Sequence, residues 1–199
     1  MSLLDASLLT VESLCCRRGE HLLFKALSFS ILPGEALQVT GSNGVGKSSL
    51  LRVIAGLLPF ESGTLQVATE QFYLGHQLGL KKTLTVEENL RFDMRYPKPS
   101  KATICSLLQE TVLSQCSGKP VLELSQGQQQ RLALAKCLLS KAKLWLLDEP
   151  FAALDKDSCC LWKNYMVQHL QQGGAIIFSS HLALAFSDIS LRQMELLSC

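Results

Sequence analysis

The chain has 199 residues, of which 47% are hydrophobic and 18% charged, and its formal net charge is +2. This composition is typical of a globular domain with its own hydrophobic core and excludes a disordered chain. The small net charge argues against a dedicated nucleic-acid-binding protein, whose basic surface would normally be larger.

The first third of the sequence predicts short strands around a glycine-rich loop. Strands are predicted at residues 8–16, 27–31, 36–40, 63–67 and 72–75. Between the third and fourth of these strands, the glycine-rich stretch beginning at Gly41 passes into helical spacing that continues to residue 58. This arrangement of strand, glycine loop and helix is typical of phosphate-binding proteins.

The middle of the chain predicts helices and no strand from about residue 82 to 140. Helical spacing covers 85–96, with Thr85 as its cap, and resumes over 101–116 after the prolines of 97–99. We therefore expect a helical insertion here.

The end of the sequence returns to an alternating pattern. A buried strand is predicted at 142–150, a helix ended by glycines at 154–174, and another buried strand at 175–181. Strands that alternate with helices predict an α/β domain with a mainly parallel sheet.

The stretch "GSNGVGKS" fits the phosphate-loop pattern, with a strand before it and a helix after it. Its glycines allow backbone N–H groups to point at phosphate oxygens, Lys47 can reach the β and γ phosphates, and the Ser48 hydroxyl can bind Mg²⁺. The predicted nucleotide-binding residues are Gly41, Ser42, Asn43, Gly44, Val45, Gly46, Lys47, Ser48 and Ser49.

An acidic pair ends the predicted strand "LWLLDEP". The Asp148 carboxylate can hold the hydration shell of Mg²⁺, and Glu149 can take a proton from the attacking water or orient it. An acidic pair alone is a weak signal, but together with the phosphate loop it indicates nucleotide hydrolysis.

The stretch "LSQGQQQR" resembles the LSGGQ signature of ABC-type ATPases. Ser125, Gly127 and Gln128 match that signature, whereas Gln126 replaces its first glycine. "AALD", ending in Asp155, resembles the D-loop of the same family, and "FSSH", ending in His181, resembles its switch histidine, which contacts the γ-phosphate.

This resemblance covers nearly the whole chain. It implies a single P-loop ABC-type ATPase domain over 1–199, with a mainly parallel sheet, an N-terminal antiparallel β subdomain and a helical subdomain at about 82–140. It also implies ATP and Mg²⁺ as cofactors and an ATP-dependent homodimer in which each signature closes over the partner's nucleotide. In such a site Lys47, Glu149 and His181 are the catalytic residues.

A family glutamine normally reaches Mg²⁺ from the end of the strand that leads into the helical region. Here the sequence reads "FYLGHQ", and counting back from Leu84–Val86 places His76 at that position with Gln77 next. We expect His76 to face the nucleotide as a magnesium ligand together with Ser48 and Asp148, and Gln77 is the alternative.

The adenine-stacking position departs from the family pattern. An aromatic residue usually precedes a glycine there, but this chain has Arg17 and Arg18 before Gly19. A guanidinium can stack on a base, and Phe24 or no stacking at all are the alternatives.

Within the family, "YLGHQLGLKKTLTVEENLRF", Trp145 and "QHLQQGGAIIFSSH" look like the ATP-binding subunit of bacterial cytochrome c biogenesis (Ccm) haem export systems. This resemblance implies ATP use that drives either haem export or the release of haem from a periplasmic haem chaperone. It also implies integral membrane partners of the Ccm permease type, a peripheral place on the cytoplasmic face of the inner membrane, and no direct contact with haem. The alternatives are an ATPase subunit of a transporter for another substrate and, less favoured, a soluble ABC ATPase acting on nucleic acid or ribosomes.

The eight cysteines include no C-x-x-C pair, and the N-terminus has no basic segment typical of a signal peptide. We therefore expect reduced thiols without a part in the chemistry.

Overall fold

Parallel strands form the central sheet of the computed structural model, which describes residues 7–92, 98–180 and 191–197. The strands are β3 (Ala36–Thr40), β5 (Gln71–Leu74), β6 (Leu144–Asp148), β7 (Ala175–Ser179) and β8 (Leu191–Glu195). Their spatial order is β5-β6-β7-β3-β8, and all four pairings are parallel. The predicted mainly parallel sheet is confirmed.

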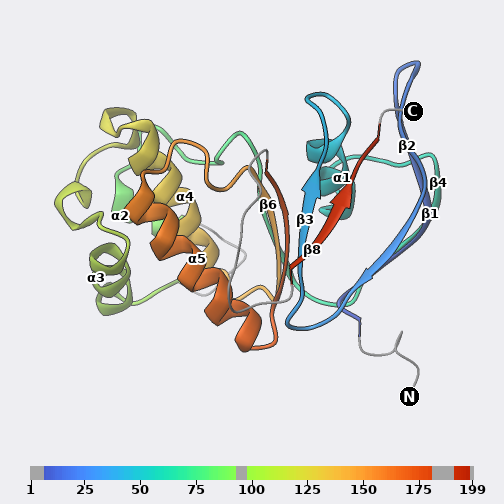
Figure 1. Cartoon of the computed structure of the whole chain (residues 1–199). Helices are drawn as coiled ribbons and strands as arrows, with labels where there is room; N and C mark the ends of the chain where they lie inside the picture. Colours follow the sequence, from blue (N-terminus) through green and yellow to red (C-terminus); the bar gives the residue numbers. More distant parts are fainter. Residues whose placement is uncertain (1–6, 93–97, 181–190, 198–199) are drawn as a thin grey trace.

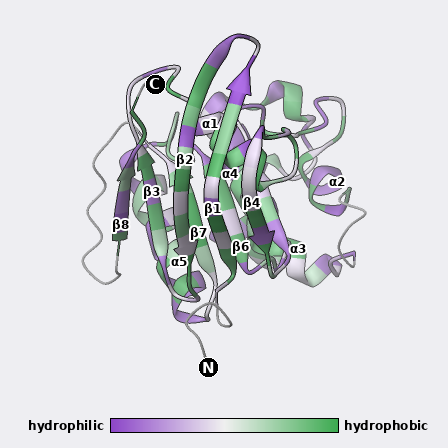
Figure 2. Ribbon diagram, turned by 90° about the vertical axis from the view of Figure 1, so that its right-hand side faces the viewer, coloured by the Kyte–Doolittle hydropathy of each residue, from purple (hydrophilic) through white to green (hydrophobic). Residues whose placement is uncertain are grey.

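A second sheet is antiparallel and comes from the N-terminal part of the chain. It contains β1 (Leu9–Arg18), β2 (His21–Ile31) and β4 (Ser62–Val67) in the order β2-β1-β4. Figure 2 shows these strands side by side, with hydrophilic residues at the tip of the β1–β2 hairpin. The predicted N-terminal antiparallel subdomain is confirmed.

The helices pack on both faces of the central sheet. They are α1 (Lys47–Ile54), α2 (Val86–Arg91), α3 (Lys101–Glu110), α4 (Gln126–Leu139) and α5 (Lys156–Gln171), with short 3-10 turns η2 (Ser114–Cys116) and η3 (Val121–Glu123). Figure 1 shows α1 between the two sheets and the remaining helices beyond the opposite face of the parallel sheet. Between β5 and β6, the described residues form no strand apart from one isolated bridge, Thr85 to Pro120.

Helix α1 fixes the distance between the two sheets. Leu50, Leu51, Val53 and Ile54 are all buried and share one cluster with residues of both sheets. Full burial of one such side chain contributes about 1.5–3 kcal/mol. The first turn of α1, which carries Lys47 and Ser48, is therefore held rigidly at the carboxyl end of β3.

The capping prediction at Thr85 is confirmed by a capping box, in which Thr85 and Glu88 bond to each other's backbone N–H. The predicted helix 101–116, however, ends as α3 at Glu110. Val112, just beyond it, has a φ of 57°, and a left-handed residue after the last turn ends a helix.

The sequence pattern did not predict β8, which extends the central sheet beside β3. Its residues, "LRQME", are exposed or half-buried. An edge strand of this kind lacks the apolar run by which β3, β6 and β7 were recognised.

Candidate nucleotide-binding site

The glycine-rich loop connects β3 to α1 at the carboxyl end of the central sheet. Gly41 has a φ of 134°, and a Cβ atom added to it would lie 2.5 Å from the Leu196 carbonyl oxygen. Gly44 and Gly46 have φ values of 81° and 114°, which residues with side chains rarely adopt. The loop therefore requires these glycines for its turn and for its close approach to the chain after β8.

Lys47 holds its positive charge inside this loop. Its side chain is 6% exposed, and its Nζ donates hydrogen bonds to the carbonyl oxygens of Gly41 (2.8 Å) and Ser42 (2.9 Å). An ammonium group has three N–H donors, so one more can be directed at a phosphate. Around it, Val45 is buried while Asn43 is exposed and Ser49 half-buried.

Ser48 and Asp148 join the phosphate loop to the end of β6. The Ser48 hydroxyl donates to Asp148 Oδ1 at 3.0 Å. The same oxygen accepts a second hydrogen bond, at 2.7 Å, from the hydroxyl of Ser179 at the end of β7. Two motifs that lie far apart in the sequence therefore meet at one carboxylate oxygen.

The other oxygen of Asp148 is suited to a cation. Asp148 is 4% exposed, and its buried Oδ2 has no hydrogen-bond partner among the described residues. An ionised oxygen buried in this way is costly unless a positive group meets it. Because Mg²⁺ is usually held by one or two protein oxygens together with phosphates and water, the hydroxyl of Ser48 and the carboxylate of Asp148 fit a magnesium ion bound with a nucleotide.

Among the described residues, no group of three or more histidine, cysteine or acidic side chains could hold a metal ion by itself.

Glu149 begins the turn that follows β6. Its φ is 51°, a left-handed value that non-glycine residues adopt only when the surrounding structure enforces it. Its backbone N–H donates to the Ser179 hydroxyl at 2.9 Å, and its carbonyl oxygen accepts from the N–H of Ala152 at 3.0 Å. The position of the predicted general base is therefore fixed by its backbone.

A cavity of about 280 Å³ lies beside the acidic pair. Its walls come from the end of β5, the start of α4 and the turn after β6. It is lined by Gly75, His76, Leu78, Gln126, Gln129, Gln130, Asp148, Glu149, Ala152 and Ala153. His76 and Gln77 are both exposed, but only His76 is among the described residues that line this cavity. The geometry therefore favours His76 over Gln77 as the residue that faces the acidic pair.

The signature segment caps α4. The Ser125 hydroxyl accepts from the Gln128 backbone N–H at 3.2 Å, and the Gln128 side chain accepts from the Ser125 backbone N–H at 2.9 Å. The hydroxyl hydrogen of Ser125 can still be donated to a phosphate. A Cβ atom added to Gly127 would lie 2.9 Å from the Ala153 carbonyl oxygen, which explains why a glycine is needed there.

Asp155 caps α5. Its carboxylate accepts a hydrogen bond from the Ser158 backbone N–H at 2.8 Å. This bond, together with the Ser158 hydroxyl and the nearby charge of Arg131, lowers the pKa of Asp155 below its ordinary value. Asp155 is therefore ionised at neutral pH, and as the last residue of the predicted D-loop it connects that loop to the start of α5.

Sequence reasoning missed two residues of the site. Ser179 bonds to both acidic residues, and Gln130 on α4 donates from its side-chain amide to the Pro150 carbonyl oxygen at 2.9 Å. Both lie inside motifs that were identified, "FSSH" and "LSQGQQQR". The predicted switch residue His181 lies outside the described residues.

Burial reduces the number of residues that could stack on the adenine base. Phe24 is 3% exposed and packs in the core beside α1, so it is not available to stack on a base. Arg17 lies at the exposed end of β1, where its Nε contacts Glu61 Oε2 at 3.3 Å. This leaves stacking by an arginine or no stacking at all.

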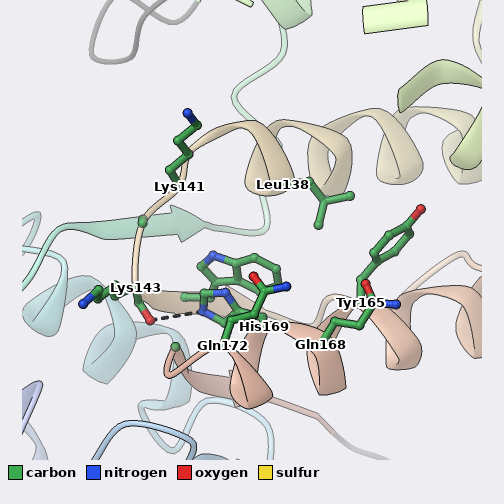
Figure 3. Close-up of a pocket in the computed structure, with 10 residues that line it drawn as sticks. Leu138, Lys141, Lys143, Tyr165, Gln168, His169 and Gln172 are labelled. Carbon is green, nitrogen blue, oxygen red and sulfur yellow. Dashed lines mark hydrogen bonds between the residues drawn. The ribbon is translucent and has the colours of Figure 1, made fainter. Parts of the chain in front are cut away.

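A second cavity, of about 330 Å³, lies at the amino ends of β6 and β7. Trp145 on β6 stacks on His169 of α5, with ring centroids 3.7 Å apart and an interplanar angle of 10°. The His169 Nε2 donates to the Lys143 carbonyl oxygen at 3.1 Å. Figure 3 shows the side chains of Lys141 and Lys143 extending away from the His169 ring. The stack therefore ties α5 to the sheet, at the opposite end of β6 from the acidic pair.

No helix in the described ranges is long and apolar enough to cross a membrane.

Several known proteins that resemble this chain belong to one family. Residues 24–152 match the family model described as ABC transporter. The chain is 40% identical over 200 residues to the cytochrome c biogenesis ATP-binding export protein CcmA of Rhizobium meliloti, covering 94% of this chain and 97% of that protein. It is 39% identical over 203 residues to the protein of the same name from Vibrio cholerae, covering 95% and 98% of the two chains.

Among solved structures, an ABC transporter ATP-binding protein from Pyrococcus furiosus superposes with a TM-score of 0.82 at 25% sequence identity. The match covers 94% of this chain and 96% of that one.

Proposed function

The chain belongs to the ABC transporter family of ATP-binding proteins, and from this premise we propose that it is the ATP-hydrolysing subunit of a membrane exporter that serves cytochrome c biogenesis. The observation that carries the proposal is the identity of about 40%, over nearly the full length of both chains, to proteins named for that process. The contact between Ser48 and Asp148 supports hydrolysis, because it brings the phosphate loop and the acidic pair together.

In the proposed reaction, Lys47 neutralises phosphate charge and Glu149 takes the proton of the attacking water. Ser48, Asp148 and His76 would hold a magnesium ion, which when bound supplies positive charge to the phosphates. The other phosphate-loop residues bind the nucleotide through their backbone, and His181 contacts the γ-phosphate.

As a subunit of this family, the chain works with membrane subunits and as a dimer. We propose an ATP-dependent homodimer in which Ser125, Gly127, Gln128 and Asp155 act on the nucleotide of the partner subunit. We further propose permease partners of the Ccm type, a place on the cytoplasmic face of the inner membrane, and haem as the cargo, without direct contact between haem and this chain.

We propose that residues 1–199 act as one nucleotide-binding domain, with the helical subdomain at about 82–140 facing the membrane partners. An isolated antiparallel bridge between Thr85 and Pro120 joins the two segments of this region that flank α2 and α3. The segment 78–82, between β5 and α2, would carry the signal from the nucleotide to the partner.

The proposal is tested by deleting the gene in its host and restoring it with wild-type or Glu149→Gln protein. Deletion should remove the c-type cytochromes that stain for covalent haem on a denaturing gel, and only the wild-type protein should restore them. Affinity purification from native membranes should then recover integral subunits with the chain. Normal c-type cytochromes in the deletion strain would disprove the proposed role in cytochrome c biogenesis. The ATPase activity of the chain is tested separately, by measuring ATP hydrolysis with the purified protein.

A further inference from the structure

Ser179 lies where the two acidic residues of the site meet. It is the last residue of β7, it is fully buried, and its register partner on the adjacent strand is Asp148. Register partners on neighbouring parallel strands carry their side chains on the same face of the sheet. The hydroxyl of Ser179 is therefore placed beside the Asp148 carboxylate by the sheet itself.

The Ser179 hydroxyl makes two bonds of opposite direction. It donates its hydrogen to Asp148 Oδ1 at 2.7 Å and accepts the Glu149 backbone N–H at 2.9 Å. A hydroxyl can donate once and accept twice, so one group restrains both acidic residues.

The first bond decides which Asp148 oxygen remains for a cation. Oδ1 receives hydrogens from Ser179 and Ser48, whereas the buried Oδ2 meets no partner in the part of the chain that the structure describes. Ser48 is itself a proposed magnesium ligand, and its hydroxyl can donate to Asp148 while its lone pairs remain for the ion. Ser179 supplies the second hydrogen bond to Oδ1, so the two hydroxyls together leave Oδ2 for a cation.

The second bond fixes the general base. Glu149 has a left-handed φ of 51°, which is unfavourable for a residue with a side chain. The Ser179 hydroxyl accepts the Glu149 N–H at the start of this turn, so the backbone of this half-buried residue is held where its φ is unfavourable.

We propose that Ser179 is a positioning residue for hydrolysis, which orients Asp148 toward the magnesium ion and holds the backbone of Glu149 in its strained conformation. This inference rests on the proposed magnesium site. In this role Ser179 acts through its bonds to Asp148 and Glu149.

The test compares Ser179→Thr with Ser179→Val in the full chain. Threonine keeps the hydroxyl, valine has nearly the same shape without it, and both suit a strand. We expect Ser179→Thr to retain most of the wild-type kcat. Ser179→Val should lose at least about 10-fold in kcat, because charge-positioning bonds at active sites are worth this much or more.

A second measurement separates positioning from stability. Mn²⁺, used as a paramagnetic probe with ADP, should bind Ser179→Val several-fold more weakly than Ser179→Thr, while ADP binding in EDTA stays equal in the two variants. Thr111→Val is the matched control, since Thr111, the C-cap of α3, is also fully buried and its hydroxyl donates to the Leu107 carbonyl oxygen. It should change neither kcat nor Mn²⁺ binding.

Equal kcat and equal Mn²⁺ affinity in the two Ser179 variants would overturn the inference. It would also be overturned if Thr111→Val, at the same melting temperature as Ser179→Val, showed the same loss of kcat and of Mn²⁺ binding. If Ser179→Val does not fold, Ser179→Ala takes its place with the same expected losses. Wild-type hydrolysis that needs no divalent cation would instead refute the magnesium site on which the inference rests.

Discussion

Ser48 and Asp148, 100 positions apart in the sequence, are joined by a hydrogen bond of 3.0 Å. Ser48 lies in the first turn of α1, directly after the phosphate loop, and Asp148 is the last residue of β6 in the central sheet. Since α1 is packed between the two sheets and β6 is fully buried, the core holds the backbone at both residues. This contact places the phosphate end and the hydrolytic end of the site in one rigid frame.

Lys47→Ala should abolish hydrolysis, with kcat reduced by roughly 100-fold or more, and should weaken ATP binding. The reason is the loss of the charge that Lys47 holds within the loop through Gly41 and Ser42. Phosphate release and nucleotide binding measure the two effects. Lys141→Ala, which removes a lysine far from the loop at the opposite end of β6, is the charge control. Unchanged turnover in Lys47→Ala would remove this lysine from the catalytic residues.

Glu149→Gln should retain ATP binding while turnover falls by about 10²–10⁴-fold, the usual contribution of a general base. Glutamine keeps the size of the side chain, and the bond from the residue 149 N–H to Ser179 does not depend on the carboxylate. The variant should form an ATP-dependent dimer that is visible by size-exclusion chromatography with light scattering. Wild-type hydrolysis by this variant would show that another group is the base.

The proposed sharing of each nucleotide site between two chains predicts complementation. Mixing Lys47→Ala with Ser125→Arg chains gives heterodimers in which one site carries both changes and the other carries neither. Activity should return on mixing, provided that one intact site turns over alone, and wild-type specific activity should rise with protein concentration. A specific activity that stays flat over a wide range, in protein verified as monomeric, would contradict action of Ser125 in trans.

How far the sequence predicts this site depends on whether a role is written in one contiguous stretch. Gly41–Ser48 could be identified from its spacing, and Asp148–Glu149 from its place at the end of an apolar strand together with that loop. Ser179 could not, because its role arises from the register between β6 and β7, which brings it beside Asp148.

The same limit applies to packing and to edge elements. Gln130 acts through a contact with the Pro150 carbonyl oxygen, across 20 positions of sequence. Strand β8 is recognised by its pairing with β3 rather than by its weak apolar pattern. The left-handed φ of Val112, which ends α3 early, could not be predicted either, because a β-branched residue rarely adopts such a φ.

His169 predicts a pH-dependent part of stability. Burial lowers the pKa of its imidazole below the ordinary value, against the opposing effect of its bonds to the backbone at Lys143 and Ala175. The folded state therefore takes up the proton less readily than the unfolded chain. This penalty is absent above the ordinary histidine pKa of about 6.5, and it grows as the pH falls through and below that value.

The free energy of unfolding should accordingly fall between about pH 7.5 and pH 5.5, and His169→Gln should reduce that fall. Glutamine can still donate to the Lys143 carbonyl oxygen but does not titrate. Urea unfolding at the two pH values measures the difference. The same pH dependence in both proteins would show that His169 does not contribute.

His76 and Gln77 of "GHQ" are the two candidates to face the proposed magnesium ion. His76 lines the cavity beside Asp148 and Glu149, whereas Gln77, although exposed, is not among the described residues of its wall. We therefore expect His76→Ala to lose at least about 10-fold in kcat and to require more Mg²⁺, because a group facing the charge that develops in the reaction is removed. His76→Gln should restore most of the activity, since a glutamine oxygen can take the same role toward a cation or its bound water. Gln77→Ala is the matched neighbour and should have a mild effect. An inactive Gln77→Ala together with a fully active His76→Ala would transfer the role to Gln77, and would mean that the chain rotates after Gly75 when nucleotide binds.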